Sequence, residues 1–142
     1  VLAVLRATEI DNPDAHVILG DQLSAEPIAV AMRQGDEAFV DVVNWMLAAL
    51  LIAEEEGITS ANVADMAATP PNPRVARLLG AEPGMGERLG LRDTWAREMI
   101  AAVGNFGEIY DRNLGKDSPY KLERGLNNLW SHGGVLYAPI LD

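Results

Sequence analysis

The stretch DEAFVDVVNWMLAALLIAEEEG, residues 36–57, decides the fold of this chain. Residues 45–53 are all apolar, so a helix formed here is apolar on nearly every side and is expected to be buried. Asp36 or Glu37 is placed to cap the start of the helix, and Gly57 can take the left-handed conformation just past its end. We therefore predict a central core helix over these residues.

The end of this predicted helix carries three consecutive glutamates, residues 54–56. Negative charge is unfavourable at the C-terminal end of a helix, so solvent or a basic partner is expected to face these carboxylates. The apolar run is about half as long as the ~20 residues that a transmembrane helix requires, which excludes a membrane span here.

The composition narrows the class of protein. The chain has 142 residues, enough for one domain with a sizeable core, and its 49% hydrophobic and 23% charged residues are typical of globular proteins. A net charge of −10 argues against nucleic acid and against an anionic membrane surface as partners. The absence of cysteine excludes disulfides, thiolate nucleophiles and cysteine-ligated metals.

Upstream of the central helix the pattern predicts a short helix and two short strands. Residues 1–8 have one apolar helical face, while residues 16–19 and 28–33 are short apolar runs bounded by turn residues. Two strands are too few for a stable sheet, so part of the sheet is expected to lie outside this chain. The chain starts with Val1 rather than methionine, and we expect it to begin inside a longer polypeptide.

Downstream of residue 57 the pattern is helical almost to the end. Trp95 and Trp130 in this region, like Trp45 in the central helix, fall on predicted apolar helical faces, where core packing is expected. The predicted elements are a helix from Thr59 or Ser60 to Met66, a helix over 74–79 opened by Pro73, a loop over 81–90, a helix from Asp93 or Thr94 to Gly115 that bends at Gly104 and Gly107, a helix from Ser118 to Trp130, and an extended tail over 131–142.

No residue pattern predicts a catalytic or metal site. His16 and His132 lack a spacing that joins them to each other or to carboxylates, so both are expected to be structural. No serine lies in a G-x-S-x-G turn, and acidic pairs such as Asp36 and Asp41 are explained by solvated helix faces. The glycines at 84, 86 and 90 are spaced G-x-G-x-x-x-G without a preceding strand or a Walker lysine, which favours a loop over a phosphate site.

Several long motifs resemble one family, in one order along nearly the whole chain. They are EPIAVAMRQGD (26–36), EEEGITSANV (54–63), NPRVARLLG (72–80), LGLRDTWA (89–96), VGNFGEIYDRNLG (103–115), SPYKLERGLNNLW (118–130) and GGVLYAP (133–139). Together they resemble periplasmic amino-acid-binding proteins of ABC importers, in the general L-amino-acid or glutamate/glutamine-binding subfamily. The chain departs from the family pattern at Gly20, residues 29–31 and Ile140, which lie at strand ends and in the tail.

The resemblance implies an α/β fold, mostly helical with two or three short strands, that forms the C-terminal portion of a two-lobed type II periplasmic-binding-protein fold. Residues 1–33 would be a remnant of the second lobe with the strand that crosses the hinge. Residues 34–142 would be a helical region that packs on the first lobe.

The resemblance also implies where the ligand lies. In such proteins two lobes close on an amino acid, and nearly all residues that hold it would lie upstream of this chain. Glu26 is the one residue here expected to approach the ligand, and its alternative role is a carboxylate at the rim or at the strand end. No catalytic residue, metal or cofactor is implied.

The expected function is therefore a part of a periplasmic, non-enzymatic solute-binding protein whose intact form delivers amino acids to a membrane permease. The chain alone is expected not to bind the ligand. The alternative is a stand-alone helical interaction domain, without ligand, that buries its apolar surface in a homodimer. A small enzyme is a third reading with no residue pattern in its favour.

Overall fold

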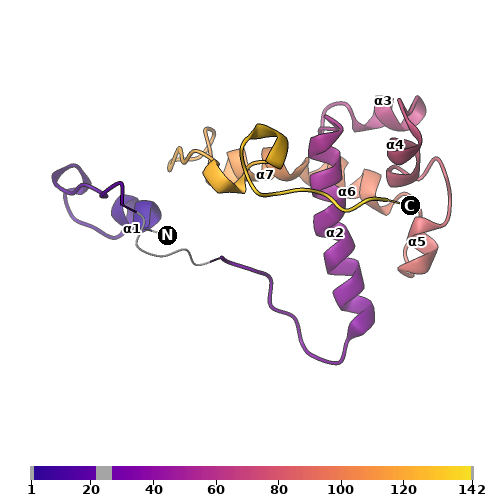
Figure 1. Cartoon of the computed structure of the whole chain (residues 1–142), viewed down its shortest axis with the longest axis horizontal. Coiled ribbons are helices and arrows are strands. Elements are labelled where there is room, and N and C mark those ends of the chain that lie inside the picture. The colour runs from indigo at the N-terminus through magenta and orange to yellow at the C-terminus, as the bar shows by residue number, and fades with distance from the viewer. Residues whose placement is uncertain (1, 22–26, 142) are drawn as a thin grey trace.

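The computed structural model describes residues 2–21 and 27–141. Within these residues the chain forms helices joined by turns and extended segments (Figure 1). The α-helices are α1 (Leu2–Thr8), α2 (Glu37–Glu55), α3 (Val63–Ala68), α4 (Pro73–Leu78), α5 (Met85–Arg88), α6 (Trp95–Val103) and α7 (Phe106–Asn113). Short 3-10 turns are η1 (Pro13–Ala15), η2 (Gly125–Asn127) and η3 (Trp130–His132).

Helix α2 is the central element, as the sequence predicts. The Asp36 side chain accepts a hydrogen bond from the Phe39 N–H at 3.2 Å, and Gly57 follows the helix with a φ of 66°. Both predicted end signals are thus confirmed. Burial is confirmed from Val43 onward, whereas the first turns of the helix are exposed, with Phe39 at 52%. The first half projects beyond the elements that cover the second (Figure 1).

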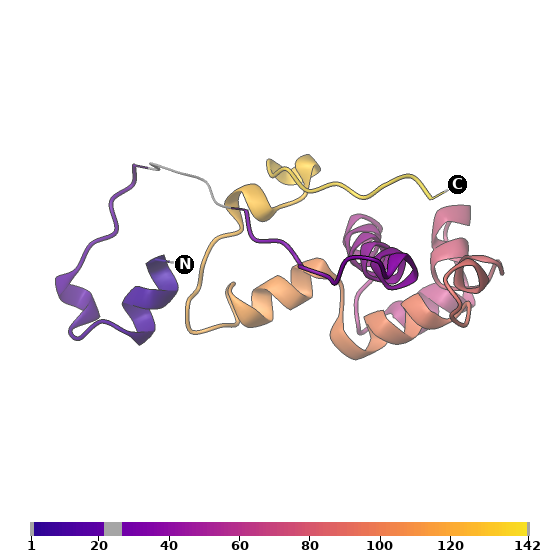
Figure 2. The ribbon, with the colours of Figure 1, turned by 90° about the horizontal axis from the view of Figure 1, so that it is seen from below.

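The core forms where α2 is covered on both sides. Figure 2 shows α2 between the C-terminal arm, which we define as residues 133–141, and the pair α6 and α7. Side chains that are fully enclosed there each contribute roughly 1.5–3 kcal/mol of transfer free energy. The largest are Ile52, Ile58, Val75, Leu78, Leu79, Ile100 and Leu129.

Most predicted helix boundaries downstream of α2 agree with the structure. Asn72 accepts a hydrogen bond from the Val75 N–H at 2.9 Å, and Pro73 opens α4 as expected. Gly80, with a φ of 79°, closes it, and a Cβ there would clash with the Asp93 carbonyl. Helix α3 begins later than predicted, at Val63, because residues 59–62 form a hydrogen-bonded turn before it.

The two predicted strands, residues 16–19 and 28–33, are not formed. Both segments are extended, but neither has a neighbouring strand in the described part of the chain. An extended segment becomes a strand only when another segment satisfies its backbone hydrogen bonds. The β-pairing seen among the described residues is an isolated parallel bridge between Leu129 and Leu136. The prediction of a mostly helical chain is confirmed, and its strand component is wrong for these residues.

Two helix predictions and one loop prediction also differ from the structure. The predicted helix from 118 to 130 is replaced by turns, because Lys121 and Gly125 have positive φ values of 47° and 50° that interrupt any helix. The predicted bend at Gly104 is a full break, with a φ of 80°, which separates α6 from α7. The predicted loop over 81–90 contains the single turn α5.

The three tryptophans that were predicted to lie in the core differ in burial. Trp45 and Trp95 are partly buried and pack against the core. Trp130 is 66% exposed, so its predicted core position is wrong. None of the helices in residues 2–21 and 27–141 combines the length and the apolar character that a membrane crossing needs.

Candidate functional site

The three glutamates at the end of α2 are all paired with basic or amide groups. Arg124 donates both terminal nitrogens to the Glu54 carboxylate, one of them to Oε2 at 3.1 Å. The Arg124 guanidinium also lies 5.6 Å from the ring centres of both Phe106 and Tyr110. Only 15% of the Arg124 side chain and 13% of the Glu54 side chain are exposed. This pair fixes the segment before the C-terminal arm to the central helix.

The next two carboxylates hold α4 and the arm. Arg74 donates to Glu55 at 2.9 Å and to Glu56 at 3.0 Å, and the Asn72 side chain donates to Glu56 at 2.8 Å. The second Glu55 oxygen accepts the Ala138 backbone N–H at 3.0 Å. Because all these carboxylate oxygens are engaged, the cluster is suited to holding segments together rather than to acid–base chemistry. Of the two expected neighbours of these carboxylates, solvent or a basic partner, the structure shows basic partners.

A cleft of about 830 Å³ lies between α4 and the arm. Arg77 donates to the Leu141 carbonyl at 2.9 Å, which holds the end of the arm beside α4. Trp130 and Tyr137, 66% and 70% exposed, give the cleft an aromatic rim. Among the described residues that line this cleft, no nucleophilic side chain lies next to a base. The cleft therefore lacks the arrangement of a catalytic centre.

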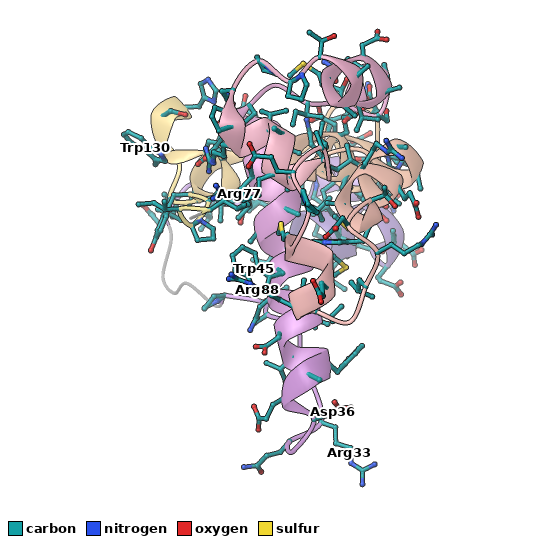
Figure 3. All side chains as sticks on the ribbon, turned by 90° about the vertical axis from the view of Figure 1, so that its right-hand side faces the viewer. Arg33, Asp36, Trp45, Arg77, Arg88 and Trp130 are labelled. Carbon is teal, nitrogen blue, oxygen red and sulfur yellow. The ribbon has the colours of Figure 1, made fainter. Side chains whose placement is uncertain are left out.

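A second cleft of about 470 Å³ shares Arg77 and Leu141 with the first. Figure 3 shows Arg77, Trp45 and Arg88 on the same side of the molecule, and all three line this cleft. The Arg88 side chain makes no ion pair or hydrogen bond with any residue that the structure describes, whereas the Arg77 guanidinium lies 3.6 Å from the Glu82 carboxylate. The two clefts place guanidinium and aromatic groups beside the arm.

A third concavity is apolar and lies between the N-terminal segment and α7. We name it the α7 groove; its volume is about 640 Å³. Leu5, Ile28 and Leu114 in its lining are 42%, 87% and 37% exposed. Apart from one asparagine, the described lining residues are all apolar or aromatic: Val4, Leu5, Pro27, Ile28, Phe106, Tyr110, Leu114, Leu122 and Asn127.

His16 and two of the serines have structural contacts in the folded chain. His16 Nδ1 lies 3.1 Å from the Asn12 carbonyl, and His132 lies in η3, far along the chain. Ser60 donates to Glu108 at 2.6 Å, and the buried Ser118 hydroxyl donates to the Gly115 carbonyl at 2.8 Å. Among the described residues, no group of three histidine, aspartate or glutamate side chains is arranged to hold a metal ion.

Glu108 links the start of α7 to the turn that precedes α3. Its carboxylate accepts hydrogen bonds from the Ser60 hydroxyl, the Ser60 N–H and the Asn105 N–H, while Asn105 accepts from the Glu108 N–H in a capping box. Burial by itself raises the pKa of Glu108. The hydrogen bonds from Ser60 and Asn105, with the nearby charge of Arg112, outweigh burial and lower the pKa below its usual 4.5.

The glycine-rich loop is filled by a carboxylate of its own chain. Asp93 Oδ1 accepts the N–H groups of Gly84 and Gly86 at 3.0 and 2.8 Å. These are the amides that a phosphate would need, so the loop is closed by an internal contact. The contact agrees with the preference for a loop over a phosphate site.

The residue predicted to approach a ligand, Glu26, lies outside the described residues. Phe106, Tyr110 and Leu114, which are spaced along one side of α7, contribute to a concavity, the α7 groove. Its second wall, with Leu5 and Ile28, was missed. The uninterrupted apolar run at residues 28–32 was the available signal, since such a run requires cover.

Three curated relatives match nearly the whole chain. The general L-amino acid-binding periplasmic protein AapJ of Rhizobium johnstonii is 50% identical over 95% of this chain. The putative amino-acid ABC transporter-binding protein YhdW of Escherichia coli K12 is 45% identical over 92% of it. The glutamate/glutamine/aspartate/asparagine-binding protein BztA of Rhodobacter capsulatus is 44% identical over 97%. No family model matches the chain.

A solved structure shows the same arrangement of the backbone. An ABC transporter periplasmic binding protein from Brucella ovis, with glutathione bound, superposes with a TM-score of 0.90 at 48% sequence identity. The match covers 97% of this chain and 43% of that protein. The chain spans 40% of AapJ and of BztA and 38% of YhdW.

Proposed function

We propose that this chain, which belongs to the amino-acid-binding periplasmic proteins of ABC transporters, acts as one part of such a binding protein. The intact protein would capture an amino acid in the periplasm and present it to a membrane permease. The observation that carries this proposal is 50% identity to AapJ over 95% of the chain. The TM-score of 0.90 to a periplasmic binding protein also supports it.

The proposed activity is binding and release, without a chemical step. The names of the relatives describe binding proteins for amino acids, and the solved relative holds glutathione, a small peptide with carboxylates. In the proposed mechanism two lobes close on the ligand, and the closed form is the one that the permease recognises. The ligand class we propose is a free amino acid, as in AapJ and BztA.

The proposed division of the chain places residues 1–33 in the second lobe and hinge, and residues 34–142 in the region that packs on the first lobe. The described parts of the N-terminal segment support this division, because α1 lies at one end of the molecule and faces the later helices across the α7 groove (Figures 1 and 2). Within 28–33, Ile28 and Val30 are 87% and 56% exposed. A segment so exposed and so apolar fits a connection that other parts of the protein cover.

We propose that this chain alone does not hold an amino acid. The three glutamates of α2 and the arginines beside them are engaged with one another, which leaves no preformed clamp for an amino acid there. Glu26 keeps its proposed place near the ligand in the intact protein.

The test compares the chain with a chimera. In the chimera this chain replaces the matching 40% of AapJ. Calorimetric titration with glutamate, glutamine and aspartate should show binding to the chimera and none to the chain alone. Micromolar binding by the chain alone would contradict the proposal that the chain by itself does not hold an amino acid. A folded chimera that binds none of the three, nor a wider panel of L-amino acids, would contradict the proposed function.

A further inference from the structure

The second cleft, which we now name the Arg88 cleft, is formed by four separate elements. Trp45 comes from α2, Arg77 from α4, Met85 and Arg88 from α5, and Leu141 from the C-terminal arm. Trp45 and Met85 pack against the hydrophobic core, and Leu141 is part of it. The volume of about 470 Å³ lies in the range of about 300–1,000 Å³ that is typical of small-molecule sites. The folded chain therefore forms a cleft of suitable size from its own residues.

The loop that carries Arg88 is fixed by contacts within the chain. Asp93 Oδ1 accepts the N–H groups of Gly84 and Gly86, as described above. A Cβ at Gly86 would lie 2.5 Å from the Arg92 carbonyl, so the backbone of α5 packs closely on the segment that precedes α6. A cleft whose walls are already positioned loses little conformational entropy when a ligand binds.

The charge of the Arg88 cleft is opposite in sign to that of the whole chain. Its described lining carries two arginines and one glutamate, whereas the chain has a net charge of −10. Arg77 donates to the Leu141 carbonyl and lies 3.6 Å from Glu82. The Arg88 side chain has no such partner among the residues that the structure describes. Its guanidinium is therefore available for an anionic group, which it can bind through two parallel hydrogen bonds.

The rest of the cleft is apolar. Apart from the three charged residues, the described lining consists of Trp45, Pro83, Gly84, Met85, Leu89 and Leu141. An inorganic anion would leave these walls unfilled, whereas a ring or an aliphatic chain would cover them and could lie against the indole of Trp45. A ligand ammonium group would compete with Arg77 for Glu82, the one carboxylate among the described lining residues. The cleft therefore favours an acid without an amino group.

We propose that the Arg88 cleft binds a small carboxylic acid with an apolar body. The carboxylate is held by Arg88, and the apolar part lies against Trp45, Met85 and Leu89. The inference uses only residues of this chain and does not rest on the proposed function. Its ligand also differs in class from a free amino acid.

Phenylacetate is the probe for this site, and the first titration uses the whole chain. Calorimetry measures the affinity, and the NMR signals of the indole N–H groups show which of the three tryptophans lies near the ligand. The Trp45 signal is identified by its loss in Trp45→Phe. Phenylacetamide has the same shape without the charge, and acetate has the charge without the ring.

Two arginine variants form a matched pair. Arg88→Gln removes the proposed carboxylate partner. Arg97→Gln is the control, because Arg97 is an exposed arginine of α6 that also makes no ion pair with the residues described and does not line the Arg88 cleft. A third variant, Leu89→Ser, reduces the apolar wall and leaves Arg88 in place.

The expected result is that phenylacetate shifts the Trp45 signal and binds at least about tenfold more tightly than phenylacetamide or acetate. Arg88→Gln should weaken binding about tenfold, Leu89→Ser should weaken it as well, and Arg97→Gln should change it by less than about twofold. Thermal unfolding checks that each variant is folded.

Several outcomes would overturn the proposal. They are no saturable binding of phenylacetate up to about 10 mM, equal affinity for phenylacetamide, and equal effects of Arg88→Gln and Arg97→Gln. A shift of the Trp130 signal in place of the Trp45 signal would also overturn it, because Trp130 lines the neighbouring cleft.

The same titration of the AapJ chimera tests the site in the complete binding protein. Phenylacetate binding that depends on Arg88 should persist there. Its loss in a folded chimera would overturn the proposal, because the rest of the protein would then cover the cleft. Amino-acid titration of the chimera tests the proposed function separately, so either proposal can fail while the other holds.

Discussion

Arg124 and Glu54, seventy positions apart in the sequence, form a nearly buried ion pair in which both terminal guanidinium nitrogens bond the carboxylate. Their side chains are only 15% and 13% exposed. Burial removes most of the water that would solvate each charge, so each charge is stabilised mainly by its partner.

Removing one member of this pair should be costly. We expect Arg124→Ala to lower the free energy of unfolding by about 3 kcal/mol, because Glu54 is left as a buried unpaired charge and two ring contacts are lost. Urea unfolding measures the change. The control is Arg92→Ala, which breaks the exposed Arg92–Glu98 pair and should cost less than about 1 kcal/mol. Similar losses for both variants would show that the buried pair has no special role.

Glu108 should make the stability of the helical body depend on pH. Its pKa is lowered in the folded chain, so its stabilising contribution is fully present above the ordinary pKa of 4.5 and is lost as the pH falls through the lower, folded value. Glu108→Gln should therefore be less stable than the parent at neutral pH, with a smaller difference at about pH 3. Unfolding measured across this range checks the sign, and a difference that grows as the pH falls would contradict it.

Gly134 should be essential for the turn that starts the C-terminal arm. A Cβ at this position would clash with the Asn128 backbone, where the chain turns back beside Leu129. We expect Gly134→Ala to displace the arm and lower the Tm by several degrees. Gly20→Ala is the control, since a Cβ there meets nothing within 4 Å. Tryptophan fluorescence reports the displacement through Trp130 at the base of the arm, and an unchanged spectrum and Tm would contradict the prediction.

The division at residue 33 predicts that the helical body folds without the N-terminal segment. The core side chains come from residue 43 onward, and Arg33 lies on the extended connection at the exposed start of α2 (Figure 3). A variant that starts at Gln34 should keep cooperative unfolding and a Tm within about 3 °C of the full chain. Loss of cooperativity would show that residues 1–33 belong to the same folding unit.

Much of the helical architecture could be predicted from local signals. Asp36, Asn72 with Pro73, and Gly80 mark helix ends in the sequence and in the structure, because capping depends on residues within one turn of each end. The region after Ser118 could not be predicted in this way. Its apolar spacing indicates a helix, but Arg124 is bound to Glu54 and to the Asn127 carbonyl, and these contacts favour a turn.

The candidate surfaces likewise depend partly on local sequence signals and partly on tertiary contacts. The apolar face of α7 is visible as a helical period in the sequence, while its position opposite Ile28 across a groove depends on where a distant segment lies. The predicted strand at 28–33 shows the same dependence, since its extended conformation is local but its pairing requires another segment.

The sequence by itself determined the family, the central helix and most helix ends, because these follow from motifs and from interactions within a few residues. Only the tertiary structure decided which carboxylates are neutralised by Arg74 and Arg124, that the glycine-rich loop is closed by Asp93, and that segment 27–33 remains unpaired beside the α7 groove. The physical reason is that ion pairing, burial and strand pairing depend on groups brought together from distant parts of the chain, which local periodicity does not encode.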